Sequence, residues 1–170
     1  ATEITATVTV NSDSTNEAPI FTAFAEAIAV TKEDTEVEIT LDALLYQGNE
    51  SDVDGTVTGF VITSVDSASG TLEIGTTAAS AQAWDATNNA TVDATNKAYW
   101  TPAANANGTL NAFTAVAQDN DGAESATAII ATVTVNSDGT NDAPTFTAFA
   151  VPIAVTNEDT AVEITLDDLL

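Results

Sequence analysis

Two short acidic stretches of the chain have the residue types and the spacing of a calcium-binding loop. Asp52 and Asp54 alternate with other residues in DVDG, and Asp119 and Asp121 do so in QDNDG. Calcium is a hard cation that takes about six to eight oxygen ligands from carboxylates, amides and backbone carbonyls. Two carboxylates converge on such a tight turn, and the following glycine lets the backbone curve around an ion. Both stretches therefore predict calcium (Ca2+) binding.

Further acidic residues gather in four other places along the chain. The stretches 11–21 (NSDSTNEAPIF) and 136–146 (NSDGTNDAPTF) are near copies of each other, and the tripeptide EDT occurs twice, at 33–35 and 158–160. Their oxygen-bearing side chains are further candidate calcium ligands: Asp13, Asn16, Glu17, Glu33, Asp34, Asp138, Asn141, Asp142, Glu158 and Asp159.

A metal-free turn is the alternative interpretation of each stretch taken alone, because Asp-Gly is also a common hairpin turn. Neither DVDG nor QDNDG is an EF-hand, since the longer loop that ends in a bidentate Glu is missing. The acidic residues nevertheless cluster in loops, while the expected strands carry mostly Thr and Ala. A merely solvated acidic surface would spread its charge along the outward strand faces, so we favour calcium.

The charge balance of the chain is almost entirely of one sign. The sequence has 26 acidic residues against two lysines, Lys32 and Lys97, and a formal net charge of −24. Without a basic patch, such a surface repels nucleic acid and anionic lipid. No apolar run is long enough to span a bilayer. The absence of cysteine excludes a disulfide framework, so an extracellular form needs another means of stabilisation.

Catalysis is not expected from this set of residues. With no His, Cys or Arg, the remaining acid–base pair would be two carboxylates, as in glycosidases. Carboxylates in repeated loops do not suggest one catalytic cleft, so we expect no enzyme.

A long internal repeat organises the chain. Residues 1–45 align without a gap with residues 126–170, so that residue 11 matches residue 136, and 35 of the 45 positions are identical. A period this long indicates a tandem array of whole domains. We expect the last strand of a preceding repeat at 1–10, a linker at 11–19, a complete repeat at 20–135, a second linker at 136–144 and the start of the next repeat at 145–170.

Alternation of apolar and polar residues predicts an all-β fold. In AIIATVTV, Ile129, Ala131, Val133 and Val135 share one face, as the period of two in a strand requires. About seven strands in one repeat predict a Greek-key β-sandwich of the immunoglobulin or cadherin kind. The expected strands are 36–41, 56–65, 70–75, 97–102, 109–118 and 128–135, with a further strand to complete the seven.

Three local features complete this prediction. LDALL at 41–45 predicts one helical turn with Asp42 as its N-cap. Asn107-Gly108 predicts a hairpin turn. Residues 76–96 show no clean period and are expected to form a long excursion that carries Trp84. For Trp84 and Trp100 we favour packing in the core over a platform that stacks against sugars.

Several sequence motifs of the chain resemble those of the cadherin-like, VCBS-type repeats of giant bacterial surface adhesins, including the large RTX adhesins. The resemblance covers nearly the whole chain and lies in TNDAPTF, NEDTAVEITLDDLL, SDVDGTVTGF and YWTPAANANGTLNAFTAVAQDNDGAESA. It implies β-sandwiches joined end to end, calcium at the junctions that stiffens the array, and a cell-surface, extracellular location. The implied function is to extend a distal binding region away from the cell.

The stretch 136–146 also resembles the linker between cadherin domains. The resemblance implies ligand roles for Asp138, Asn141 and Asp142, and likewise for Asp13, Asn16 and Glu17 in the upstream copy. Glu33 and Glu158 resemble the acidic residue at the base of a cadherin domain, and Asp52 and Asp54 its paired-aspartate loop. The partners it implies are neighbouring repeats of the same chain.

Two other functions remain open from the sequence. A carbohydrate-binding module would use calcium, a β-sandwich and exposed, coplanar tryptophans. A self-assembling filament or sheath would arise if the first strand of one molecule completed the last fragment of another by strand complementation.

Overall fold

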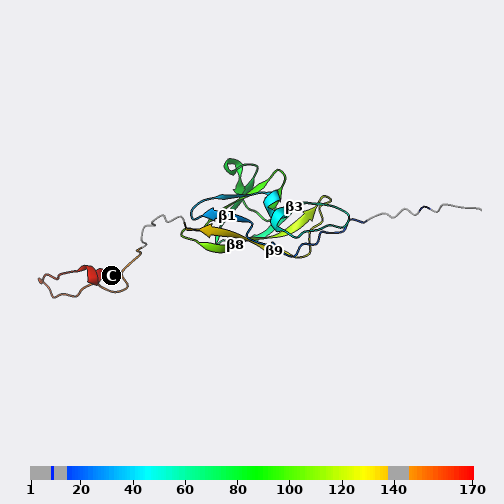
Figure 1. Cartoon of the computed structure of the whole chain (residues 1–170). Helices are drawn as coiled ribbons and strands as arrows, with labels where there is room; N and C mark the ends of the chain where they lie inside the picture. Colours follow the sequence, from blue (N-terminus) through cyan, green and yellow to red (C-terminus); the bar gives the residue numbers. More distant parts are fainter. Residues whose placement is uncertain (1–8, 10–14, 138–145) are drawn as a thin grey trace, which may run out of the picture. The chain divides into compact units, whose positions relative to one another are not determined.

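The computed structural model of the protein describes residue 9, residues 15–137 and residues 146–170 (Figure 1). Contacts along the chain divide it into two units, Ala1–Gly139 and Thr140–Leu170. Every β-strand of the described residues lies in the first unit. No helix within these residues is long and apolar enough to cross a membrane.

The first unit is built from two β-sheets, which confirms the prediction of an all-β sandwich (Figure 1). The five-stranded sheet has the order β1 (Ala29–Lys32), β9 (Ile129–Asn136), β8 (Gly108–Asp119), β3 (Val57–Val65) and β6 (Thr91–Asp93). The four-stranded sheet has the order β2 (Val37–Ile39), β7 (Lys97–Pro102), β4 (Gly70–Gly75) and β5 (Gln82–Ala83). Strand β1 runs parallel to β9, whereas the other named pairs are antiparallel.

The core lies between the inner faces of the two sheets. On β9 the predicted alternation is confirmed, because Ala131, Val133 and Val135 are buried while the intervening residues are more exposed. Side chains from both sheets meet there, as expected when each strand presents alternate residues inward. The largest fully buried ones are Trp100, Phe60, Phe113, Ile39, Leu44 and Ile62.

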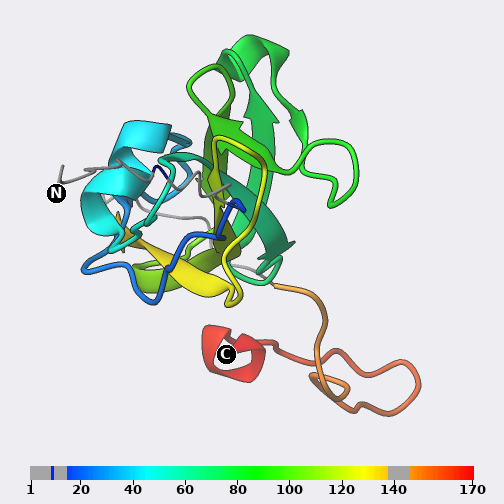
Figure 2. The same cartoon turned by 90° about the vertical axis from the view of Figure 1, so that its right-hand side faces the viewer.

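The N-terminal segment of the unit is anchored beside the helix α1 (Leu41–Gln47). Phe21 is buried, and its ring packs edge-on against Phe60 with centroids 5.4 Å apart. The Asn49 side chain accepts hydrogen bonds from the backbone of Thr22 and Ala23 at 3.0 and 2.9 Å. Figure 2 shows this blue segment next to the cyan helix. These contacts fix where the preceding residues 15–20 enter the domain.

The helix begins differently from the prediction. Thr40 is the N-cap, because its Oγ1 accepts the backbone N–H of Ala43 at 3.1 Å, and Asp42 lies inside the first turn. The prediction that Asp42 caps the helix is therefore wrong. Leu41, expected to face inward from a strand, is the first helical residue. Thr takes the cap because its short hydroxyl reaches the free N–H groups of the first turn.

The excursion at 76–96 has more structure than its irregular pattern suggested. It contains a 3-10 turn η1 (Ala78–Ser80) and the short strands β5 and β6, one on each sheet. Together with β1, these strands bring the number in the described residues to nine rather than about seven. Asn107-Gly108 does not form a hairpin, because β7 and β8 belong to different sheets and the loop crosses between them.

The second unit repeats part of the sequence of the first but not its strands. Residues 146–170 differ from 21–45 at only five positions, and their described secondary structure is the single short helix α2 (Leu166–Leu169). Ile39 is fully buried between the sheets, whereas its equivalent Ile164 is 46% exposed. The same sequence is thus buried only where the later strands of a sandwich are present to cover it.

This difference predicts unequal costs for one substitution made at two equivalent positions. Ile39→Ala should lower the free energy of unfolding by about 2–5 kcal/mol, because it leaves a cavity in a packed core. Ile164→Ala should change it by less than about 0.5 kcal/mol, as at exposed sites. Urea denaturation followed by tryptophan fluorescence measures both. Equal effects of the two substitutions would contradict the assignment of the core.

Candidate metal centre

The QDNDG stretch folds into a tight turn around one buried carboxylate. Asp119 ends β8 and is only 2% exposed. Its Oδ1 accepts the backbone N–H groups of Asp121 and Ala123 at 2.9 and 2.8 Å. Gly122 has φ +90°, a left-handed conformation that favours glycine. The turn thus holds the Asp119 carboxylate in a fixed orientation.

The DVDG stretch forms a similar turn before β3. Asp52 Oδ1 accepts the backbone N–H groups of Asp54 and Gly55 at 3.0 and 2.7 Å. A Cβ atom on Gly55 would lie 2.7 Å from Asn120 Oδ1 and 3.3 Å from Asp52 Oδ1. A larger residue at this position would therefore have to displace the Asn120 side chain of the neighbouring loop.

One hydrogen bond joins these two loops to each other, and two more join them to the N-terminal segment. The backbone N–H of Thr56 donates to Asn120 Oδ1 at 2.8 Å. The Asn16 amide donates to Asp119 Oδ2 at 2.8 Å. The backbone N–H of Glu17 donates to Asp54 Oδ1 at 3.3 Å. Six residues predicted from the sequence thus lie together with Asn120 at one end of the sandwich, and we refer to this set as the Asp119 cluster: Asn16, Glu17, Asp52, Asp54, Asp119, Asn120 and Asp121.

Glu33 and Asp34 lie at the other end of the five-stranded sheet. Glu33 is buried, its backbone N–H donates to Asn136 O at 3.2 Å, and its carboxylate accepts the Ser137 hydroxyl at 3.3 Å. Asn136 ends β9, which is antiparallel to β8, so about eleven residues of strand, or roughly 36 Å, separate this end from Asp119. These two residues therefore do not belong to the Asp119 cluster.

The remaining candidates fall elsewhere. Glu158 and Asp159 belong to the second unit, where they repeat the conformation of the first EDT stretch. Asp159 has φ 56° and Asp34 has φ 55°. The predicted ligands Asp13, Asp138, Asn141 and Asp142 lie outside the described residues.

The donor atoms of the Asp119 cluster suit a hard cation, although the cluster is not a closed carboxylate cage. No group of three or more His, Cys, Asp or Glu side chains in the described residues is arranged to hold a metal. Calcium also accepts amide and backbone oxygens, which this cluster supplies. Asp52 Oδ2 and Glu50 Oε2, both in the same loop, are buried and have no hydrogen-bond partner within the described residues. A cation would compensate such buried carboxylate oxygens.

Two carboxyl groups of this region have pKa values displaced in opposite directions. The hydrogen bond from the Asn16 amide is the main cause that lowers the pKa of Asp119 below its ordinary 3.8, and the N–H groups of Ala123 and Asp121 add to it. Burial raises the pKa of Glu50 above its ordinary 4.5. Donors stabilise the ionised form of Asp119, whereas Glu50 loses hydration without gaining an equivalent partner.

Sequence reasoning missed two residues of this region. Asn120 joins the two acidic loops through its side-chain amide oxygen, a role that the acidic pattern of QDNDG does not indicate. Glu50 precedes Asp52 and Asp54 at the same spacing of two, which was a usable signal. Two features of the sequence nevertheless indicate these residues. Asn120 has an amide oxygen between two aspartates, and Glu50 continues the alternate acidic positions of Asp52 and Asp54.

The two tryptophans pack in the domain and do not form an exposed platform. Trp100 is fully buried in the core. Trp84 packs against the core, and its Nε1 donates to Ile62 O at 3.1 Å. The preference for core packing is confirmed, and the interpretation of these rings as a sugar-stacking surface is wrong.

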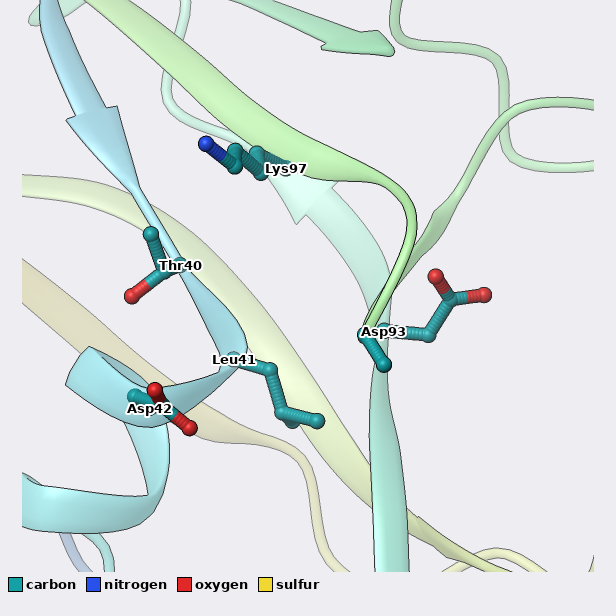
Figure 3. A pocket seen from close by; sticks show the side chains of 6 residues that line it. Thr40, Leu41, Asp42, Asp93 and Lys97 are labelled. Carbon is teal, nitrogen blue, oxygen red and sulfur yellow. The ribbon is translucent and has the colours of Figure 1, made fainter. Parts of the chain in front are cut away.

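A hollow on the surface lies between the start of α1, the end of β6 and the start of β7 (Figure 3). Thr40, Asp42, Asp93 and Lys97 are among its lining residues. The Lys97 ammonium group already pairs with Glu38 at 2.8 Å, and the Asp93 carboxylate points away from Lys97. Lys97 and Asp93 therefore do not act on a common point in this hollow.

No protein-family model matches the chain, and no curated protein is significantly similar to it.

The Asn16 contact predicts a pH-dependent effect. Because the folded pKa of Asp119 is lowered, its contribution to stability is complete above the ordinary value and is lost as the pH falls through the folded value. Asn16→Ala should therefore destabilise the first unit at neutral pH, and the difference from wild type should shrink on acidification. Thermal melts across a pH series measure it, with Asn107→Ala in an exposed loop as control. A difference that stays constant down to pH values below the ordinary 3.8 would contradict the role of this hydrogen bond.

Proposed function

We propose that the protein is an extracellular repeat module whose junctions are stiffened by calcium. In this role it extends a distal binding region of a bacterial cell-surface adhesin, as the resemblance in its sequence implies. The observation that carries the proposal is the Asp119 cluster. There, two acidic loops far apart in the sequence meet the segment through which the chain enters the sandwich.

The residues that would hold calcium can be named from this arrangement. Asp52 offers its unpartnered Oδ2, while Asp54, Asp119 and Asp121 offer further carboxylate oxygens. Glu17 sits at the same place on the entering segment. Bound calcium would supply the positive charge that an almost cation-free chain lacks. The protein's own part is to fix the loops, so that binding costs little ordering.

The two ends of the sandwich support an end-to-end array. The chain enters the sandwich beside Asp119 and leaves it at Asn136, next to Glu33. Each domain therefore presents acidic groups where a neighbour would join. In an array, Glu33 and Asp34 would lie at the end of the domain from which the chain continues. Mutual repulsion of two acidic ends would favour bending unless cations bridge them.

Occupancy of the calcium sites would differ between the inside and the outside of a cell. Extracellular calcium modules bind with dissociation constants of about 10⁻⁴–10⁻³ M. Sites of this strength stay empty inside a cell and fill outside it, so the array would stiffen only after export.

A calcium titration tests the proposal directly. Calcium, but not magnesium, should raise the melting temperature of the first unit. At about 100 times the dissociation constant, one site adds about 2.7 kcal/mol of stability. Asp52→Asn with Asp54→Asn should abolish this response. Calorimetry in EDTA and across calcium concentrations measures it.

The matched control is Glu26→Gln with Glu73→Gln, which removes the same amount of charge from exposed side chains outside the cluster. The control should keep the calcium response. Small-angle scattering should also give a longer particle in calcium than in EDTA. An identical melt and particle length in both conditions would overturn the proposal.

Self-assembly into a filament is a second candidate function, which the second unit favours. Phe146, Val155, Ile164 and Leu166 are exposed there. The equivalents of Phe146, Ile164 and Leu166 in 21–45 pack in or against the core of the first sandwich, whereas Val30, the equivalent of Val155, is also exposed. Such a row of apolar residues can be covered by further strands in the same chain or by another molecule.

Fusing a copy of residues 46–137 after Leu170 distinguishes the two candidates. The extender role predicts a second cooperative sandwich, less binding of an apolar dye, and a monomer before and after fusion. A filament subunit would form defined oligomers before fusion, seen by light scattering, that disappear when the added strands cover 146–170.

A further inference from the structure

The tetrapeptide DATN occurs twice in the excursion, at 85–88 and 93–96, and folds the same way both times. Asp85 Oδ1 accepts the backbone N–H groups of Thr87 and Asn88 at 3.0 and 2.8 Å. Asp93 Oδ1 accepts the N–H groups two and three residues further on, both at 2.7 Å. Two identical turns thus stand on either side of the edge strand β6.

These turns help to line a hollow of about 500 Å³ on the outer face of the five-stranded sheet. Val61 pairs with Thr91 in the sheet, and its neighbours Phe60 and Ile62 point into the core, so Val61 faces outward. Loop 86–90 provides one wall. The other lining residues include Thr91, Asn96, Gln118 and Glu124. The volume is in the range of small-molecule sites, about 300–1,000 Å³.

Two side-chain amides at this hollow, Asn88 and Asn96, are held through their amino groups, and their carbonyl oxygens accept no hydrogen bond from the described residues. The Asn88 Nδ2 donates to Asp85 Oδ1 at 3.0 Å, and the Asn96 Nδ2 lies 3.4 Å from both Asp93 oxygens. The amino group must face the carboxylate, since oxygen cannot donate. The amide oxygen of each asparagine is therefore the atom left to accept from a ligand hydroxyl.

The wall of the hollow is rigid. The Asn89 Nδ2 donates to Gln82 O at 2.9 Å, to Ala83 O at 3.2 Å and to Ile74 O at 3.3 Å, which ties the loop to the four-stranded sheet. Trp84 anchors the same loop to β3 through its bond to Ile62 O. A ligand would thus meet a preformed surface, which lowers the ordering cost of binding.

The charge of the hollow is unusual for this protein. In a chain with 26 acidic residues, Glu124 is the one carboxylate among the residues that line the hollow, and none of them is basic. A single carboxylate is a poor site for calcium, and an anionic ligand would find no cation. Amide and hydroxyl groups instead suit a neutral ligand with many hydroxyls, because each partner can donate and accept.

We propose that this hollow binds a neutral glycan, with Asn88, Asn96 and Gln118 as its hydrogen-bonding residues. No tryptophan and no residue of the Asp119 cluster lines the hollow. It would add weak lateral binding to each repeat, which an array multiplies through avidity.

The test uses the full chain and neutral gluco-, manno- and galacto-oligosaccharides, with an oligouronate as the charged comparison. Nuclear magnetic resonance titration should shift the backbone amides of 86–91 with at least one neutral sugar and with no oligouronate. The result should be the same in calcium and in EDTA, which separates this proposal from the calcium proposal. Asn88→Ala and Asn96→Ala should each weaken binding about tenfold, as loss of one or two good hydrogen bonds does.

Asn107→Ala, an exposed loop amide elsewhere, is the matched control and should bind like wild type. If either asparagine variant loses its fold, Gln118→Ala on the floor of the hollow takes its place with the same expected loss. Shifts that never involve 86–91 would overturn the proposal. So would binding that the asparagine variants leave unchanged, or equal binding of the oligouronate.

Discussion

The shortage of cations constrains every part of this structure. With 26 carboxylates and two ammonium groups, ion pairs cannot stabilise the folded chain, and the described residues contain one, between Lys97 and Glu38. Carboxylates instead accept backbone N–H groups. Asp52, Asp85, Asp93 and Asp119 each bind two such groups through one oxygen. This arrangement requires tight turns, so these four carboxylates sit in turns beside or at the ends of strands.

The strands that the sequence predicted well are those that lie inside a sheet. β3, β4, β7, β8 and β9 match their predicted ranges to within a residue at each end, because burial on one face imposes a period of two. β1, β5 and β6 were missed, since short strands at sheet edges are selected by their neighbours rather than by their own pattern. Of the predicted ligands, six proved to lie together. Glu33 could not be separated from them in advance, because only the antiparallel course of β8 and β9 sends it to the opposite end.

The two copies of the repeated segment separate local from tertiary determinants. The turn around EDT forms in both, since the Thr31 hydroxyl donates to Thr35 O at 2.8 Å and the Thr156 hydroxyl to Thr160 O at the same distance. The Phe pair is also kept, with centroids 4.9 Å apart in one copy and 4.8 Å in the other. Strands β1 and β2 occur only in the first copy, where β9 and β7 supply their hydrogen bonds. Turns follow from neighbouring residues, whereas strands need partners far along the chain.

Within the Asp119 cluster, the carboxylates are not equivalent. Both oxygens of Asp119 are occupied, one by backbone N–H groups of its own turn and the other by the Asn16 amide, so this residue joins its loop to the N-terminal segment. Asp52 uses Oδ1 in the same way but leaves Oδ2 buried and without a partner in the described residues. A cation therefore has more to gain at Asp52 than at Asp119, where it would compete with existing donors. On this argument Asp119 fixes the geometry of the cluster, and under the proposed function the loop that carries Asp52 would provide the charge that responds to calcium.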